Sequence, residues 1–123
     1  MGREKGRVTV NGETWFPIVL IGHTKVATEG LVDTGFDDLL SIPRALAVQL
    51  RLPIIGMEDY ELADGHMVSC QTAALRIRFL ARTRNVVAML SDSEEVLLGT
   101  PLMRGHRLTI RYRRRSARLD PDR

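Results

Sequence analysis

The chain has 123 residues and a mass of 13.8 kDa, enough for one folded domain and too few for two of ordinary size. Hydrophobic residues make up 44% of the sequence and charged residues 27%, which excludes a wholly disordered chain. The formal net charge is +3, but residues 111–123 hold six arginines against two aspartates, so residues 1–110 carry a net charge of −1. The basic character therefore belongs to the C-terminal residues.

Cysteine and histidine usage gives the next exclusions. The single cysteine, Cys70, excludes an intramolecular disulfide and fits a reducing compartment. Only His66 lies near it in sequence, and two ligands do not make a zinc site, so we expect no metal. The first residues contain no apolar stretch of the signal-peptide kind, and the longest apolar run, residues 15–21, is too short to span a bilayer. We therefore expect a cytoplasmic protein with no membrane partner.

Turn signals and alternating apolar residues predict short strands along the first half of the chain. The dipeptide Asn11-Gly12 favours a hairpin turn because both residues tolerate positive φ. Pro43 suits the first turn of a short helix, for which Ser41 is a candidate N-cap. The predicted strands cover residues 7–10, 14–21, 25–32 and 39–42, and the predicted helix covers residues 43–50.

The second half repeats this pattern. Two long extended segments flank a tight-turn sequence at residues 63–66. Pro101 begins a second short helix that Gly105 ends. The predicted strands cover residues 54–62, 67–80, 85–90, 95–98 and 107–112, and the predicted helix covers residues 100–104. The elements together predict a mostly β single domain over residues 1–110, with one or two short helices.

Residues 111–123 have a composition unlike the rest of the chain. They are too charged to form a core, so we expect a basic, partly disordered C-terminal tail whose removal from residue 114 onward leaves the fold intact. Tyr112 could instead extend the last strand into a dimer sheet. Binding of nucleic acid through residues 111–115 would be electrostatic and independent of sequence. Because no aromatic residues alternate with the arginines, we do not expect a nucleic-acid partner.

Asp33 differs from most of the fifteen acidic residues, which lie in polar company. It follows the apolar pair Leu31-Val32 and precedes Thr34-Gly35, where a buried strand breaks into a tight turn. A carboxylate held there is partly withdrawn from water, which makes it a candidate general acid or base. Thr34 adds a hydroxyl, and Gly35 lets backbone N–H groups approach closely. The same three residues also fit a capped turn at a strand end.

A second segment echoes this pattern. Residues 31–35 and residues 96–100 each bring an apolar strand to a glycine turn, and a predicted helix follows each of them. The match is short enough to arise by chance in a β protein. In the second segment Leu98 stands where a second aspartate would have to be, so the chain supplies one candidate catalytic aspartate.

The ordered set of motifs resembles the retropepsin-like (retroviral-type) aspartic proteases, and the Asp-Thr-Gly-Phe form is similar to small microbial members of that group. The resemblance runs from about residue 15 to residue 110. It implies a retropepsin-like acid-protease β-barrel with one half-site per chain. The motifs are Leu-Val-Asp-Thr-Gly-Phe-Asp-Asp at residues 31–38, the glycine-tipped hairpin at residues 63–66, and Val-Leu-Leu-Gly-Thr-Pro-Leu-Met at residues 96–103.

The resemblance implies a role for each matching position. Asp33 would be the catalytic aspartate, and Thr34 and Gly35 would complete the active-site turn. Asp37 matches a position that contacts the substrate main chain; viral enzymes often pair it with an arginine where this chain has Thr100, so a solvated Asp37 is equally open. The tip of the flap that closes over the substrate would be Ala63, Asp64, Gly65 and His66. The segment that supports the active-site loop would be Leu97, Leu98 and Gly99.

The activity that the resemblance implies is that of an aspartic endopeptidase. This chemistry needs two carboxylates that share one proton, one to activate water and the other to polarise the scissile carbonyl. Because one chain supplies only Asp33, we expect a homodimer, a peptide or protein substrate and no cofactor. Two alternatives stay open: a catalytically inert dimeric peptide-binding or assembly module of the same fold, and a nucleic-acid binder that uses the arginine-rich tail.

Overall fold

The computed structural model describes residues 2–123. Strands account for 58% of the chain, which confirms the predicted mostly β class. The strands are β1 (Glu4–Val8), β2 (Thr14–Ile21), β3 (Lys25–Val32), β4 (Leu40–Pro43), β5 (Ile54–Glu61), β6 (Met67–Phe79), β7 (Arg82–Ser91), β8 (Val96–Leu98), β9 (His106–Arg111) and β10 (Ser116–Pro121). The helices are one α-helix, α1 (Arg44–Gln49), and one 3₁₀ turn, η1 (Thr100–Met103).

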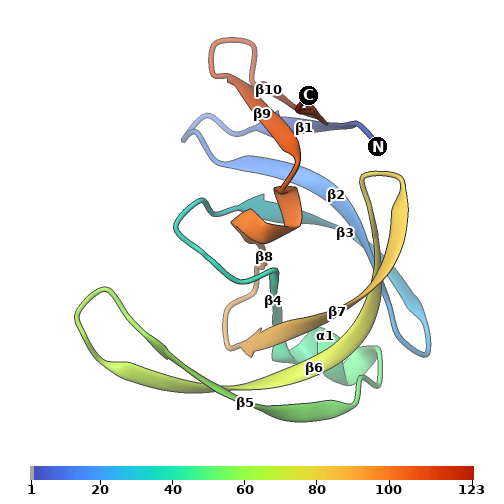
Figure 1. The fold of residues 1–123 in the computed structure, drawn as a ribbon, viewed down its shortest axis with the longest axis vertical. Coiled ribbons are helices and arrows are strands. Elements are labelled where there is room, and N and C mark those ends of the chain that lie inside the picture. Colours follow the sequence, from blue (N-terminus) through green and yellow to red (C-terminus); the bar gives the residue numbers. More distant parts are fainter. Residues whose placement is uncertain (1) are drawn as a thin grey trace.

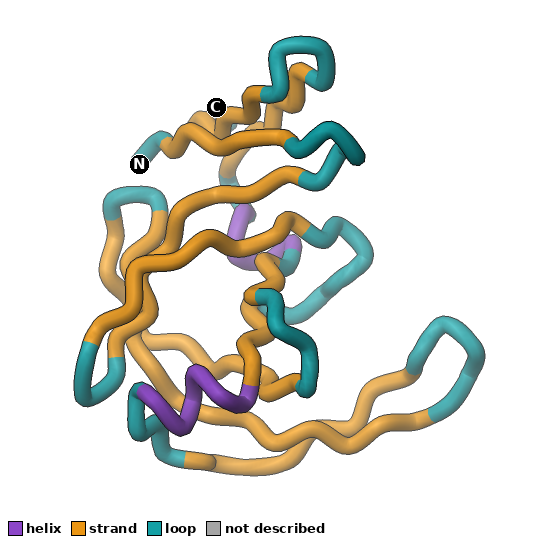
Figure 2. The backbone as a smooth tube through the Cα atoms, turned by 180° about the vertical axis from the view of Figure 1, so that it is seen from behind, coloured by secondary structure: helices purple, strands orange, loops and turns teal. Residues whose placement is uncertain are grey.

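Six of the strands close into a barrel. The strands follow the order β5-β6-β7-β4-β8-β3-β2-β1-β10-β9, and an additional pairing of β6 with β2 closes the ring of β2, β3, β8, β4, β7 and β6 (Figures 1 and 2). The apolar residues of β2 alternate as a half-buried strand requires, with Phe16, Ile18 and Leu20 turned into the core. Each of these six strands therefore has a neighbouring strand on both sides, and β5 and β9 are the outer strands of the sheet.

Two local predictions differ from the structure at turns. The first strand lies three residues earlier than predicted, because residues up to Glu13 form the hairpin loop, with Gly12 at φ +87° and Val10 exposed to solvent. Strand β7 begins at Arg82 rather than residue 85, because Leu80 and Ala81 turn the chain with φ of 55° and 58°. No glycine or asparagine signals this turn in the sequence, so a pattern-based prediction leaves it out.

The capping prediction for the helix is wrong. Ser41 lies inside β4 and is buried, whereas Pro43 is the N-cap residue of α1 and makes no side-chain hydrogen bond there. The helix itself spans six residues within the predicted range. Its start is therefore set by the fixed φ of Pro43 and by the parallel pairing of β4 with β7 rather than by a side-chain cap.

The prediction of a partly disordered tail that adds nothing to the core is wrong for residues 116–121. These residues form β10, which pairs with β1 on one side and β9 on the other. Ala117 and Leu119 are buried in the hydrophobic core with exposed fractions of 2% and 0%. The segment alternates apolar and polar residues, and one buried face is enough to make a strand even where the overall charge is high. Removal of these residues would therefore remove part of the core.

The two ends of the described chain lie side by side, because β1 and β10 run antiparallel with Glu4 opposite Leu119 (Figure 1). The sheet of β1, β10 and β9 lies at one end of the barrel, and the β5–β6 hairpin projects from the other end. Across residues 2–123, neither helical segment has the length and apolar character needed to cross a membrane.

Candidate active site

The backbone around Asp33 is held by the neighbouring strand. Asp33 follows β3 directly, and Val32 at the end of β3 pairs in parallel with Leu98 of β8. The backbone N–H of Asp33 donates a hydrogen bond to the Leu98 carbonyl at 3.0 Å. The Oδ1 atom of Asp33 accepts the N–H of Gly35 at 3.0 Å, and its carbonyl accepts the N–H of Phe36 at 3.1 Å. The side chain therefore begins from a backbone that is fixed on both sides.

A second set of contacts ties the rest of this loop to the segment after β8. The N–H of Gly99 donates to the Leu39 carbonyl at 3.0 Å, and the N–H of Thr100 donates to the Phe36 carbonyl at 3.0 Å. The Thr100 hydroxyl lies 3.4 Å from the same Phe36 carbonyl. A Cβ atom on Gly99 would overlap the carbonyl oxygen of Asp38, so only glycine fits here. Thr100 thus supports the backbone of this loop.

A cavity of about 620 Å³ lies between this loop and the β5–β6 hairpin. Asp33 is half-buried at its wall, whereas Asp37 is exposed at its rim. The residues that line it include Asp33, Gly35 and Asp37 from the loop, Tyr60, Leu62 and Ala63 from the hairpin, and Leu97 from β8. The cavity therefore lies between the candidate catalytic carboxylate and a hairpin that is about 30 residues distant along the chain. Its volume is in the range of small-molecule and peptide side-chain sites.

The hairpin is held mainly by its own strand pairing. All eight residues of β5 are exposed, and the hairpin extends away from the barrel (Figure 2). At its tip the N–H of Leu62 donates to the His66 carbonyl at 2.8 Å, and Gly65 has a φ of +90°. The Asp64 carboxylate accepts the backbone N–H of His66 at 3.0 Å and faces its Nδ1 at 2.9 Å. The backbone N–H and then the ring of His66 lower the pKa of Asp64.

Three residues of this hairpin that line the cavity, Tyr60, Glu61 and Leu62, were not among the predicted site residues. Tyr60 and Leu62 lie two positions apart, so the period-two geometry of a strand turns both toward the same side. A side-chain hydrogen bond with Cys70 raises the pKa of Tyr60, with burial as the next cause. In the sequence, the alternation of residues before Ala63 would have identified Tyr60 and Leu62 as residues that line the cavity. Met89, which also lines the cavity, carries no local signal, because the parallel pairing of β4 with β7 brings it there.

The predicted site residues fall into three groups. Those that line the cavity are Asp33, Gly35, Asp37, Ala63 and Leu97. Those that lie behind the loop and contact it through the backbone are Leu98 and Gly99. Those that lie beside the cavity without lining it are Thr34, which is exposed next to Asp33, and the hairpin-tip residues Asp64, Gly65 and His66. The structure thus brings the three motifs of the sequence together around one cavity.

Comparison with known proteins adds no assignment. Neither a scan against protein-family models nor a search of curated proteins found a match to this sequence. Within residues 2–123, no three or more His, Cys, Asp and Glu side chains gather as a metal ion would require. The functional interpretation therefore depends on the geometry around Asp33.

Proposed function

We propose that this protein is an aspartic endopeptidase that acts as a homodimer of the retropepsin-like type. The observation that carries the proposal is the position of Asp33. Its backbone is bonded to Leu98 at 3.0 Å, and its half-buried side chain opens onto a cavity of about 620 Å³ that a projecting hairpin borders. A carboxylate held rigidly beside a cavity of this size is suited to general acid–base hydrolysis.

The second carboxylate of the proposed site comes from a second copy of the chain. Leu98 occupies the position on β8 that corresponds to the end of β3, so the chain offers one Asp-Thr-Gly turn. Two copies related by a two-fold axis would bring two such turns face to face. Carboxylates about 3 Å apart cannot both be ionised, so the pair holds one proton and titrates as a unit.

The proposed reaction uses both carboxyl groups in sequence. The ionised Asp33 takes a proton from a water molecule, and the water oxygen attacks the scissile carbonyl carbon. The protonated Asp33 of the other copy donates a hydrogen bond to the carbonyl oxygen, which stabilises the charge that develops there. A proton then passes to the leaving nitrogen, and the C–N bond of the tetrahedral intermediate breaks. No metal or organic cofactor takes part in these steps.

The substrate in this proposal is an extended peptide that lies between Asp33 and the hairpin. Strand β5 is at the edge of the sheet, and on that edge it pairs with no other strand among residues 2–123. An extended peptide can pair with such an edge while its side chains enter pockets on alternate sides. Tyr60, Leu62 and Ala63 of the hairpin would contact the substrate on the side opposite Asp33.

The test compares the wild-type chain with Asp33→Asn on an unfolded protein substrate below neutral pH, with the fragments identified by mass spectrometry. The amide has nearly the shape of the carboxylate but cannot act as a base, so cleavage should fall by about 100-fold to 10,000-fold. Asp92→Asn is the matched control, because the Asp92 side chain is 93% exposed and does not line the cavity.

A peptide that carries a statine group, which resembles the tetrahedral intermediate, should inhibit the wild-type protein. Equal cleavage by the wild type and Asp33→Asn would contradict the proposal. Peptide binding by both proteins without any cleavage would indicate an inert peptide-binding module of the same fold.

A further inference from the structure

The sheet of β1, β10 and β9 has one strongly basic face. Directly opposed residues of antiparallel strands share a face, and alternate residues of one strand share it as well. The register places Lys5 opposite Arg118, Arg111 opposite Ser116, and Arg107 opposite Asp120. The residues on this face are Lys5, Arg7, Arg107, Thr109, Arg111, Ser116, Arg118 and Asp120. The opposite face carries Ala117 and Leu119 and packs into the core, so the basic face points outward.

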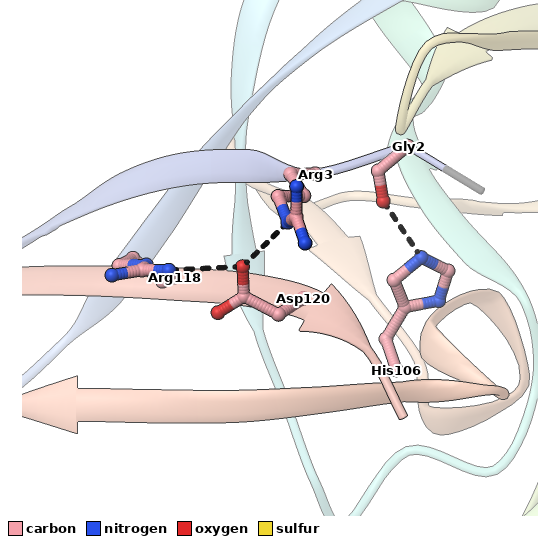
Figure 3. A network of polar contacts seen from close by, with 5 residues as sticks. All are labelled: Gly2, Arg3, His106, Arg118 and Asp120. Atoms are coloured by element: carbon pink, nitrogen blue, oxygen red, sulfur yellow. Dashed lines mark hydrogen bonds and ion pairs between the residues drawn. The ribbon is translucent and has the colours of Figure 1, made fainter. Parts of the chain in front are cut away.

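Some of these cations are paired and others are free. Arg3 and Arg118 both contact Asp120, at 3.2 Å and 3.1 Å (Figure 3), and the hydrogen bond from Arg118 is the main cause that lowers the pKa of Asp120. Arg7 forms an ion pair with Glu29 at 2.9 Å. Within residues 2–123, no carboxylate lies within 4.0 Å of the charged groups of Lys5, Arg107 and Arg111. These three exposed cations are available to an anionic partner.

The loop between β9 and β10 extends the basic face. It adds Arg113, Arg114 and Arg115, all of which are exposed. With Arg3, which contacts Asp120 of the face, nine of the eighteen lysines and arginines belong to the face and its loop. The carboxylates that pair with these cations or act on their charge are Glu13, Glu29 and Asp120, which leaves an excess of six positive charges. Because the whole chain carries +3, the rest of the chain carries −3, so the molecule is strongly polarised.

A small pocket lies at the end of this face. It has a volume of about 350 Å³ and is formed where the β1–β2 loop meets the β9–β10 loop. Tyr112 is 64% exposed, and its ring lies 3.7 Å from the position of a Cβ atom on Gly12. The residues that line the pocket are Thr9, Val10, Gly12, Tyr112, Arg113 and Arg115, without a carboxylate. The pocket therefore offers a planar ligand a ring to stack on, from Tyr112, and positive charge from Arg113 and Arg115.

We propose that this face binds single-stranded nucleic acid, with the phosphates on the exposed cations and a base in the Tyr112 pocket. Cations in rows along the strands would neutralise successive phosphates and release their counterions. Tyr112 would stack on an unpaired base, which is the usual aromatic contribution to single-strand binding. A membrane surface is a poorer match, because the uncharged strand residues of this face are Thr109 and Ser116, and the exposed apolar and aromatic side chains beside it, Val10 and Tyr112, are confined to the pocket.

This site is separate from the cavity at Asp33, since the two share no lining residue. Residues 111–115 alone offer one aromatic ring, Tyr112, and no second aromatic residue among their four arginines. The fold supplies what that segment lacks, because β1 contributes Lys5 and β9 contributes Arg107, while the two loops form a pocket around Tyr112. The proposal does not depend on protease activity.

The first experiment measures fluorescence anisotropy of a labelled uridine oligonucleotide of about 16 nucleotides, with the full chain, across a series of salt concentrations. The affinity should fall as salt rises, with a log–log slope of about −0.7 for each phosphate that is neutralised. The single strand should bind more tightly than a duplex of the same length. No binding at low salt would overturn the proposal.

The second experiment compares two double variants of equal charge. Lys5→Gln with Arg111→Gln removes two free cations of the face, and Lys25→Gln with Arg82→Gln removes two exposed cations from β3 and β7. The first pair should reduce the size of the salt slope by about 1.4, and the second pair should leave it unchanged. An equal reduction of the salt slope in both variants would show that only the net charge matters and would contradict a binding site on this face.

Two further measurements separate the base pocket and the alternative partner. Tyr112→Leu should weaken binding by about fivefold to 100-fold without a change in the salt slope, and an unchanged affinity would overturn the stacking role. Vesicles of phosphatidylserine and phosphatidylcholine should compete poorly with the oligonucleotide; vesicle binding in the absence of oligonucleotide binding would assign the face to membranes instead. Thermal unfolding of each variant confirms that it is folded.

Discussion

The carbonyl of Leu98 accepts the backbone N–H of Asp33 at 3.0 Å, so a residue of β8 determines how the candidate catalytic turn leaves β3. The same two strands also pack closely through their side chains. A Cβ atom on Gly30 of β3 would lie 2.5 Å from the Leu98 side chain. Because this contact joins the barrel wall directly to the turn, a change in the packing of β8 should shift the backbone of Asp33.

Gly99→Ala tests this coupling. The backbone of Gly99 has a φ of −84°, which alanine adopts readily, so the penalty is steric: the new Cβ atom would overlap the Asp38 carbonyl and lie 3.0 Å from the Phe36 ring. We expect a loss of about 1–3 kcal/mol in the free energy of unfolding, measured by urea denaturation. Gly56→Ala is the matched control, because its nearest heavy atom would be 3.4 Å away. Equal stability of the two variants would contradict the steric account.

Leu119→Ala tests the contribution of β10 to the core. The Leu119 side chain is fully buried, so its truncation should lower the free energy of unfolding by about 2–5 kcal/mol. Arg113→Ala, in the exposed loop before β10, should change it by less than about 0.5 kcal/mol. Deletion of residues 116–123 should unfold the protein, as seen by circular dichroism. A stable and folded deletion variant would show that β10 is dispensable.

Asp120→Asn should change how stability depends on pH. The pKa of Asp120 is lowered in the folded protein, chiefly by the hydrogen bond from Arg118, so its ionised form stabilises the fold above the unfolded pKa of about 3.9. This stabilisation is lost as the pH falls through the lower, folded value. The melting temperatures of wild type and Asp120→Asn should therefore differ at neutral pH, begin to converge as the pH falls below about 4, and meet below the folded pKa of Asp120. A constant difference across this range would exclude the linkage, and Asp122→Asn serves as the exposed control.

A mixing experiment tests whether the proposed active site is shared between two copies. Wild-type chains mixed with an equal amount of Asp33→Asn chains, and allowed to exchange, should form hybrids that contain one carboxylate and are inactive. Random pairing leaves about a quarter of the dimers with two wild-type chains, so activity per dimer should fall to about a quarter. Half of the activity would remain if each chain acted alone, and that result would contradict the shared site.

Much of the secondary structure could be predicted because its signals are local. The alternation of Leu75, Ile77 and Phe79 with arginines marks a half-buried strand, and Pro43 marks the start of the helix. The turn at Leu80-Ala81 could not be predicted, because its positive φ values are adopted by residues that do not favour them. Strand β10 was obscured by the charge of its neighbours, although Ala117 and Leu119 alternate as a strand requires.

The sequence by itself determined the mostly β class, the short helices and the three motifs, since each depends on residues a few positions apart. Only the tertiary structure decided which strands pair, and therefore that Leu98 contacts Asp33, that Tyr60 and Leu62 border its cavity, and that Lys5 and Arg111 share one face. The physical reason is that strand pairing is selected by burial across the whole barrel, where a shift of one residue would expose an entire apolar face. Local sequence patterns carry the periodicity of a strand but not the identity of its neighbour.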